Sequence, residues 1–203
     1  MPGCSAPDLA AAIRRVAAVI EAEHVRLTDL DRAIGDGDHG ANLNRGFAAV
    51  LAKLDAAPPD TPGAVLKLVA TTLISTVGGA SGPLFGTAFL RAATAVGEAP
   101  ELDSALVITA LTAARDGVVQ RGKAGPGDKT MVDALTPAVD AATGDSPADV
   151  LFAAAAAAEA GAAATEPLVA HKGRASYLGE RSAGHLDPGA VSTSLVLRAL
   201  AGP

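Results

Sequence analysis

The sequence predicts an all-α protein, and three observations support this fold class. Apolar residues recur at the three- and four-residue spacing of amphipathic helices along most of the chain. Capping residues followed directly by proline mark several helix starts. The composition is 49% hydrophobic but only 2% aromatic, so the core must consist of small aliphatic side chains, which let helices pack closely. A length of 203 residues suits one closed core, and we expect a single domain over residues 1–203.

Eight helices are expected, with no convincing strand between them. Apolar repeats locate the first two, and Thr61, Asp103, Ser146 and Asp187 can cap the third, fifth, seventh and eighth. The alanine run from Ala153 belongs to the seventh, because alanine is the best helix former. The expected spans are residues 9–30, 43–54, 62–77, 81–96, 104–120, 131–142, from 147 through the alanine run, and 188–200.

One uncharged stretch, residues 68–90, is long enough to cross a bilayer. It contains four glycines and Pro83, which are typical of a turn rather than of one continuous helix. We therefore interpret it as parts of two buried helices that a glycine turn joins.

Charge and cysteine content exclude several classes of partner. The chain has 16 Lys and Arg against 22 Asp and Glu, and it contains no basic tract, so nucleic acid is not an expected partner. The single cysteine, Cys4, permits no intrachain disulfide and fits a reducing compartment. The first ten residues contain no apolar run typical of a signal peptide. Together these features predict a cytoplasmic protein with no membrane partner.

Sequential antiparallel packing is the default for helices with short connections, and it brings every second connection to the same end. The connections after the first, third, fifth and seventh helices are the polar, glycine-rich ones. They are the aspartate loop around residue 36 and residues 78–82, 121–130 and 171–189. The sequence therefore predicts that these four connections meet at one end and form a site there.

The aspartate loop is a candidate metal site. Asp36 and Asp38 stand one residue apart between glycines, and Asp31 precedes Asp36 by five residues. Clustered carboxylates repel one another unless a cation or protons relieve the repulsion, and oxygen ligands favour Mg²⁺ or Ca²⁺. The spacing of an EF-hand is absent, which favours Mg²⁺. The alternative is a plain Asp-Gly turn, and His39 alone indicates only a structural hydrogen bond.

The glycine-rich connection at 78–86, GGASGPLFG, is a candidate anion site. Its pliable backbone leads into a helix start, where N–H groups and the helix dipole favour phosphate. It is not a P-loop, and a close helix–helix turn is the alternative. The last connection adds Lys172, Arg174 and Arg181, of which arginine can bind phosphate with two hydrogen bonds. An acidic loop, a glycine loop and an arginine together indicate Mg²⁺, a polyphosphate and phosphoryl transfer.

Four motifs in collinear order make the sequence similar to a known family. They are GDGDHGANLNRGF (35–47), GGASGPLFG (78–86), GDKTMVDAL (127–135) and GRASYLGERSAGHLDPGA (173–190). On these motifs the chain resembles the ADP-binding L subunits of bacterial phosphotransferase-system-dependent dihydroxyacetone kinases, a DhaL-like (DAK2) domain family. The resemblance implies an eight-helix antiparallel up-down barrel with the nucleotide at one end.

The resemblance also implies a set of site residues. Asp31, Asp36 and Asp38 would hold two Mg²⁺ ions that bridge to the phosphates of ADP or ATP. The implied nucleotide contacts are His39, Gly40, Ala41 and Asn42 along the nucleotide, Ala80 and Ser81 at the phosphates, Gly122 and Met131 at the base or ribose, and Arg174, Asp187, Pro188 and Gly189 around the remaining pocket.

The activity that the resemblance implies uses ADP as a held coenzyme. A phosphohistidine on a separate phosphotransferase subunit would recharge ADP to ATP, and the γ-phosphoryl group would then pass to dihydroxyacetone held on a third subunit. This chain would supply no covalent nucleophile.

Several alternatives stay open at this point. They are the nucleotide domain of an ATP-dependent dihydroxyacetone-type kinase, a domain of fatty acid kinase, a non-catalytic Mg-nucleotide-binding regulator of a transcription factor, and a purely structural bundle. A homodimer is also compatible with the sequence.

Overall fold

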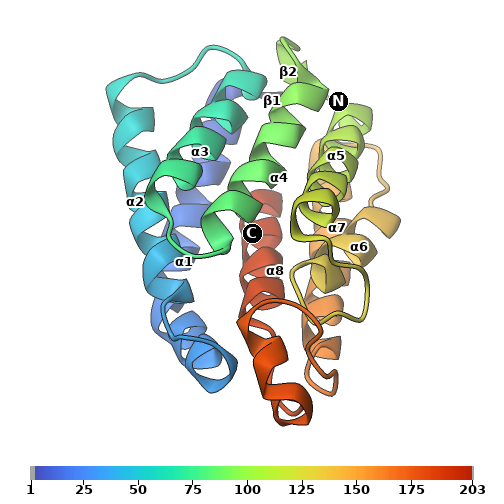
Figure 1. Cartoon of the computed structure of the whole chain (residues 1–203). Helices are drawn as coiled ribbons and strands as arrows, with labels where there is room; N and C mark the ends of the chain where they lie inside the picture. Colours follow the sequence, from blue (N-terminus) through green and yellow to red (C-terminus); the bar gives the residue numbers. More distant parts are fainter. Residues whose placement is uncertain (1–2, 203) are drawn as a thin grey trace.

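The structure is a computed structural model that describes residues 3–202 of the chain. Within this range the chain forms eight α-helices, one 3-10 helix and a pair of two-residue strands (Figure 1). In chain order the elements are β1 (Cys4–Ser5), α1 (Ala6–Ile34), α2 (His39–Ala56), α3 (Pro62–Thr76), α4 (Ser81–Val96), β2 (Glu101–Leu102), α5 (Ser104–Gly122), α6 (Val132–Asp140), α7 (Pro147–Ala164), η1 (Arg174–Ser182) and α8 (Pro188–Ala201). The predicted all-α class is confirmed.

The eight helices close into a ring. Each helix packs against the next one along the chain, and α8 packs against α1. Consecutive helices run in opposite directions, so the connections after α1, α3, α5 and α7 lie on the lower side of their helices in Figure 1. This arrangement is an antiparallel up-down barrel, and it brings the glycine-rich connections to one end.

The inward faces of the helices carry the apolar repeats and form the core. The largest fully buried side chains include Ile20 on α1, Phe47 on α2 and Leu73 on α3. Burial of one such side chain stabilises the fold by about 1.5–3 kcal/mol. An apolar cavity of about 130 Å³ remains inside the ring, and Phe85 and Met131 are among the residues that line it.

The first helix is longer than the sequence predicted, because it continues past the expected end near Leu30 to Ile34. Ile34 follows Leu27 by seven residues and both side chains are buried, so the apolar stripe continues through the charged residues between them. Gly35 follows as the C-cap of the helix. As a result, Asp31 belongs to the last turn of α1 and not to the loop.

Three further expectations need correction. The chain does contain strands, because β1 and β2 pair antiparallel with Cys4 opposite Leu102, and this pair ties the start of α1 to the α4–α5 connection. Strands of two residues are too short to leave an alternating pattern. Residues 171–189, expected to be a loop, contain η1, which Gly179 interrupts with a φ of 54°. Helix α6 is shorter than its expected span of 131–142.

The uncharged stretch 68–90 is divided between α3 and α4, as predicted. Of the helices in residues 3–202, one passes a test of length and apolar composition for crossing a membrane, and it is α7. Most of its apolar residues are alanines, and its buried side chains, such as Val150 and Ala158, pack in the ring beside α6 and α8. A core helix of a barrel meets the same test, so this result alone assigns no membrane span.

Candidate metal and phosphate site

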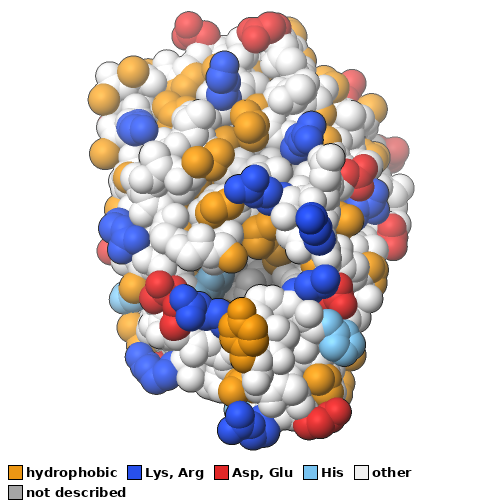
Figure 2. All heavy atoms as spheres, viewed as in Figure 1, with side chains coloured by type: hydrophobic (Ala, Val, Ile, Leu, Met, Phe, Trp, Pro, Cys, Tyr) orange, Lys and Arg blue, Asp and Glu red, His pale blue; other side chains and the backbone are white. Residues whose placement is uncertain are grey.

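The four glycine-rich connections meet around one cavity of about 180 Å³. Figure 2 shows this face of the molecule hollowed, with Lys and Arg side chains around the rim. The lining comes from five stretches of the chain: Asp31, Ile34, Gly35, Asp36, Asp38 and His39; Gly79, Ala80, Ser81, Leu84 and Phe85; Lys129, Thr130 and Met131; Lys172, Gly173, Arg174 and Ala175; and Asp187, Pro188 and Gly189. The convergence that antiparallel packing predicted is therefore present.

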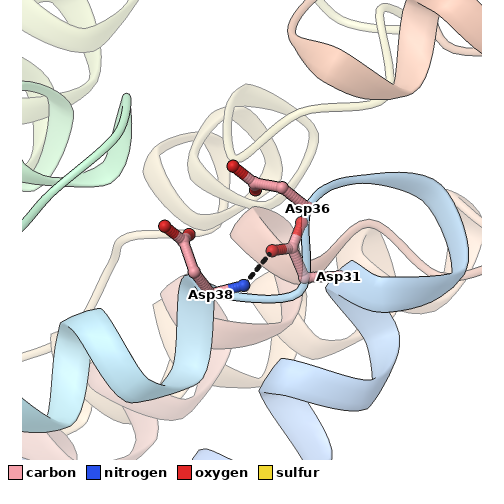
Figure 3. A group of neighbouring side chains, drawn as sticks. All are labelled: Asp31, Asp36 and Asp38. Atoms are coloured by element: carbon pink, nitrogen blue, oxygen red, sulfur yellow. Dashed lines mark hydrogen bonds between the residues drawn. The ribbon is translucent and has the colours of Figure 1, made fainter.

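Three carboxylates gather where α1 passes into α2 (Figure 3). Asp31, Asp36 and Asp38 each offer an oxygen atom, and these atoms all lie within 4.8 Å of one another. Asp31 is buried, and its Oδ2 accepts hydrogen bonds from the backbone N–H of Asp38 at 2.9 Å and of His39 at 3.2 Å. The start of α2 thus fixes the buried carboxylate in one orientation.

Gly35 makes room for the other oxygen of Asp31. A Cβ atom at Gly35 would lie 2.1 Å from Asp31 Oδ1, so a side chain at this position would displace the carboxylate. One guanidinium approaches the cluster, because Arg174 Nη2 lies 2.9 Å from Asp36 Oδ2. Three negative charges facing one positive charge leave an excess of about two, and an all-oxygen cluster of that charge fits a hard divalent cation.

His39 joins the acidic loop to two other helices. Its Nδ1 lies 2.8 Å from Ser81 Oγ at the start of α4, and its Nε2 lies 2.9 Å from Ser192 Oγ on α8. Burial lowers the pKa of this imidazole, although the nearby carboxylates of Asp31 and Asp38 oppose the shift. A neutral imidazole between two hydroxyl groups holds the start of α4 at a fixed position relative to α2.

The glycine turn and the start of α4 form the side of the cavity that suits an anion. Gly79 has a φ of 65°, and the space where its Cβ would be is open to 4 Å. The N-cap residue of α4 is Ala80, whose methyl group cannot accept a hydrogen bond from the backbone N–H groups of the first turn. The backbone N–H groups at this helix start therefore stay available to a ligand, and the helix dipole favours a negative one.

Asp187 closes the cavity from the C-terminal side. Its Oδ2 accepts a hydrogen bond from the backbone N–H of Ala190 at 2.7 Å, so it caps α8 and lines the cavity as well. Burial raises the pKa of this carboxyl to about 7, and the bond from Ala190 opposes that rise. The carboxyl group is therefore partly protonated at neutral pH.

Comparison with known proteins assigns the family at this point. The DAK2 domain matches residues 33–202, which is most of the chain. The chain belongs to the DAK2 domain family.

Proteins of two kinds are similar to this DAK2 domain. The ADP-binding subunit DhaL of PEP-dependent dihydroxyacetone kinase from Escherichia coli K12 is 46% identical over 194 residues, which are 93% of this chain and 92% of that protein. The corresponding subunit of kinase 1 from Listeria innocua is 44% identical over 86% of this chain and 84% of that protein. Human triokinase/FMN cyclase is 35% identical over 98% of this chain, which spans 35% of that longer protein.

A solved structure supports the same assignment. The dihydroxyacetone kinase of C. freundii in complex with AMP-PNP and Mg²⁺ superposes with a TM-score of 0.76 at 27% identity. The match covers 99% of this chain and 34% of that one. The chain therefore matches the two bacterial subunits over most of their length, and it matches about one third of the longer proteins.

Not all of the expected nucleotide contacts line the cavity. A Cβ at Gly40 would lie 1.9 Å from the backbone oxygen of His24, so Gly40 lets α2 pack closely on α1. Ala41 is exposed outside the lining, and Asn42 accepts a hydrogen bond from Arg45 at 2.6 Å. Gly122 ends α5 and faces Leu84. These four residues do not line the cavity, whereas the other expected residues do.

Several residues of the cavity were given no role in the site by the sequence, although most of them lie within the quoted motifs. Lys129 is the most unexpected, because its side chain is only 1% exposed and reaches backbone oxygens from the segment after α7. A buried lysine shows no spacing that distinguishes it from a surface lysine. The other lining residues that were given no role are Ile34, Gly35, Leu84, Phe85, Thr130, Gly173 and Ala175.

Proposed function

We propose that this chain is the ADP-binding subunit of a phosphoenolpyruvate-dependent dihydroxyacetone kinase and takes part in phosphoryl transfer. One observation carries the proposal: the carboxylate cluster and the uncapped start of α4 face the same cavity. Relatives that match over most of their length are named as ADP-binding subunits of this kinase. A metal site opposite a phosphate site is the arrangement that a nucleoside diphosphate with Mg²⁺ requires.

The proposed division of roles follows the chemistry of each wall. Asp31, Asp36 and Asp38 would hold two Mg²⁺ ions, and the backbone at Ala80 and Ser81 would donate to the phosphates. Met131 would border the base or ribose with its thioether. Arg174, His39 and the turn formed by Asp187, Pro188 and Gly189 would complete the pocket.

The bound nucleotide would supply the phosphoryl acceptor and donor, and the protein would supply positioning and charge. The carboxylates give the metal ions a fixed place, and Arg174 adds a positive charge at the edge of the cavity, where its side chain is 67% exposed. The N–H groups of α4 are already oriented, so they need no rearrangement to stabilise developing negative charge. We propose no covalent intermediate on this chain.

We propose two partner subunits, one that carries dihydroxyacetone and one that carries the phosphohistidine of the phosphotransferase system. Both would reach the cavity from its open, cation-rimmed face (Figure 2). Binding of a transcriptional regulator to the same face, and formation of a homodimer, are compatible with this arrangement. We propose a cytoplasmic location, since phosphoenolpyruvate and the phosphotransferase system act there.

A second candidate function is an ATP-dependent kinase domain that exchanges its nucleotide. The observation in its favour is the 35% identity to triokinase/FMN cyclase over nearly the whole chain. In that case the domain would work beside a substrate domain and would release ADP after each turnover.

Reconstitution tests the proposal and separates it from this alternative. The purified chain is mixed with a dihydroxyacetone-binding subunit and supplied either with phosphoenolpyruvate and the phosphotransferase proteins or with ATP alone. We expect phosphorylated dihydroxyacetone in the first mixture, and release of ADP when the purified chain is denatured. Product formed only with ATP, with free exchange of ADP, would favour the alternative.

A further inference from the structure

The segment between α7 and α8, residues 165–187, forms one wall of the site but has little apolar core of its own. Its buried apolar side chains, Ala170 and Ala175, form a small cluster with Ile34 of α1, with Leu178 packed against it, and Leu186 is partly buried against the main core. Its aromatic residue, Tyr177, is 86% exposed. Apolar burial of this extent cannot order more than twenty residues, so polar contacts must contribute most of the order.

Lys129, which is not part of the segment, supplies polar contacts because the segment folds around its side chain. Its Nζ lies 2.7 Å from the backbone oxygen of Ser182, 2.5 Å from that of His185, and 3.0 Å from those of Thr165 and Leu168, so its three N–H groups are shared among these oxygens. A fifth backbone oxygen, that of Glu166, lies at 3.3 Å. The segment therefore wraps around the ammonium group from both of its ends, as oxygen ligands surround a monovalent cation.

The backbone of the segment is built to present those oxygens. Ser182 Oγ accepts from Ala170 N at 2.8 Å, which joins two interior parts of the segment. Thr165 Oγ1 accepts from Asp187 N at 2.9 Å and so joins the residue after α7 to the cap of α8. Lys129 itself takes a left-handed backbone conformation with a φ of 62°, a costly arrangement for a residue other than glycine.

Removal of the ammonium would leave the backbone oxygens of Leu168, Ser182 and His185 without a donor. The oxygens of Thr165 and Glu166 would each keep a backbone N–H partner, from Leu168 and Gly184. A buried carbonyl oxygen without a donor destabilises the folded segment, and the segment has little apolar burial to offset that cost. Burial lowers the pKa of the Lys129 ammonium, while Asp187 and Glu166 oppose the shift. The oxygens that surround the group compensate its loss of water only while the segment stays closed.

We propose that Lys129 is a positioning residue of the nucleotide site, and that its ammonium is the internal cation around which residues 165–187 fold. The folded segment holds Arg174 beside Asp36 and brings Asp187 to the edge of the cavity. The inference rests on the proposed function for its effect on nucleotide binding, but not for its effect on the order of the segment.

The test compares Lys129→Met with Lys123→Met. Lys123 is the matched control, because it is the other non-glycine residue with a positive φ in residues 3–202, at 49°, but its side chain is exposed and outside the cavity lining. Amide hydrogen exchange is measured without nucleotide, and Mg-ADP affinity is measured by calorimetry. In Lys129→Met we expect exchange within 165–187 to rise by at least about tenfold while α1–α4 keep their protection, and Mg-ADP affinity to fall by about tenfold. Lys123→Met should match the wild type in both.

A rescue experiment separates positioning from a general loss of packing. In Lys129→Ala, added propylammonium should restore part of the protection of 165–187 and part of the Mg-ADP affinity, whereas propanol should restore neither. Unchanged exchange in Lys129→Met, or equal losses in Lys123→Met, would overturn the proposal.

A measurement on the unaltered protein keeps the proposal testable if both Lys129 variants fail to fold. In protein labelled with ¹⁵N-lysine, the Lys129 ammonium should give a slowly exchanging NMR signal, and a rapidly exchanging group would contradict the inference. A wild-type protein that does not bind Mg-ADP would defeat the proposed function, while the exchange comparison would still decide the role of Lys129.

Discussion

The two ends of the barrel begin their helices differently. At the end away from the site, the side chain of the N-cap residue caps each helix that begins there. These residues are Ser5 for α1, Thr61 for α3, Asp103 for α5 and Ser146 for α7. At the site end, within residues 3–202, the N-cap residues of three helices make no side-chain cap: Asp38 for α2, Ala80 for α4 and Met131 for α6. Other side chains serve two of these starts, because Asp31 accepts from His39 N and Thr130 accepts from Val132 N. Only α8 is capped there by the side chain of its own N-cap residue, Asp187.

This difference in capping separates an end that stabilises its helices locally from an end that can bind a ligand. A cap contributes about 1 kcal/mol by satisfying N–H groups that the helix leaves open. The end away from the site takes that stabilisation at every helix start. The site end leaves N–H groups of α4 free, and there they can serve an anionic ligand instead.

The largest effect is expected from removing one charge of the carboxylate cluster. Asp36→Asn should weaken Mg-ADP binding by about 100-fold, since the metal links the phosphates to the protein. The thermal stabilisation that Mg-ADP gives to the wild type should shrink accordingly, while the ligand-free protein should be no less stable, because repulsion is relieved. Calorimetry and thermal unfolding measure both effects. Asp145→Asn, in the exposed α6–α7 connection at the other end, is the control, and unchanged ADP affinity in Asp36→Asn would refute the assignment.

The cap of α8 should make stability depend on pH near neutrality. The folded pKa of Asp187 is about 7, above its ordinary value of 3.8, so the folded state binds a proton that the unfolded state has released. This group therefore contributes stability that is present at low pH and is lost as the pH rises from about 4 through about 7. Asp187→Asn should remove a pH-dependent difference on the order of 2 kcal/mol. Urea unfolding of both proteins at pH 5 and pH 8 measures it, with Asp103→Asn, an exposed cap at the other end, as the control.

A negative charge at the uncapped start of α4 should reduce binding without harming the fold. Ala80→Asp would place a carboxylate beside the N–H groups that the phosphates are proposed to use. We expect Mg-ADP affinity to fall by about tenfold and ligand-free stability to stay equal or rise by a few tenths of a kcal/mol, because an acidic group suits a helix start. If affinity were unaltered, the start of α4 would not be the phosphate site.

The smallest effect belongs to the opposite end. Ser146→Ala removes the capping box in which Ser146 and Asp149 satisfy each other's backbone N–H groups. We expect a loss of about 1 kcal/mol in the free energy of unfolding and no change in Mg-ADP affinity. A change in affinity would show that the two ends are coupled through the barrel.

Much of the fold could be predicted because each helix carries its own local information. Apolar spacing located α1 and α2, and the prolines after Thr61, Ser146 and Asp187 marked the starts of α3, α7 and α8. The end of α1 was placed too early because the charged residues after Leu27 conceal a buried stripe that reaches Ile34. The strand pair and η1 are too short or too irregular to leave a period.

The site could be predicted only in part, because the sequence identifies motifs but not the direction in which each residue points. The three aspartates come together as expected, since the loop between α1 and α2 is short. Gly40 lies in the same motif but faces α1, because a glycine in a helix serves close packing as readily as ligand contact. The environment of Lys129 depends on oxygens from residues at least 36 positions later, which no local pattern can reveal.

An even number of antiparallel helices has one more consequence, for the two chain ends. Gly3 lies beside Glu101 at the start of the barrel, and Gly202 lies beside Arg15 on α1, so neither described terminus borders the cavity. A polypeptide fused to either terminus, or a tether to a neighbouring module, would leave the mouth open to visiting proteins. The same geometry would let this domain work equally well as a free subunit or as one segment of a larger enzyme.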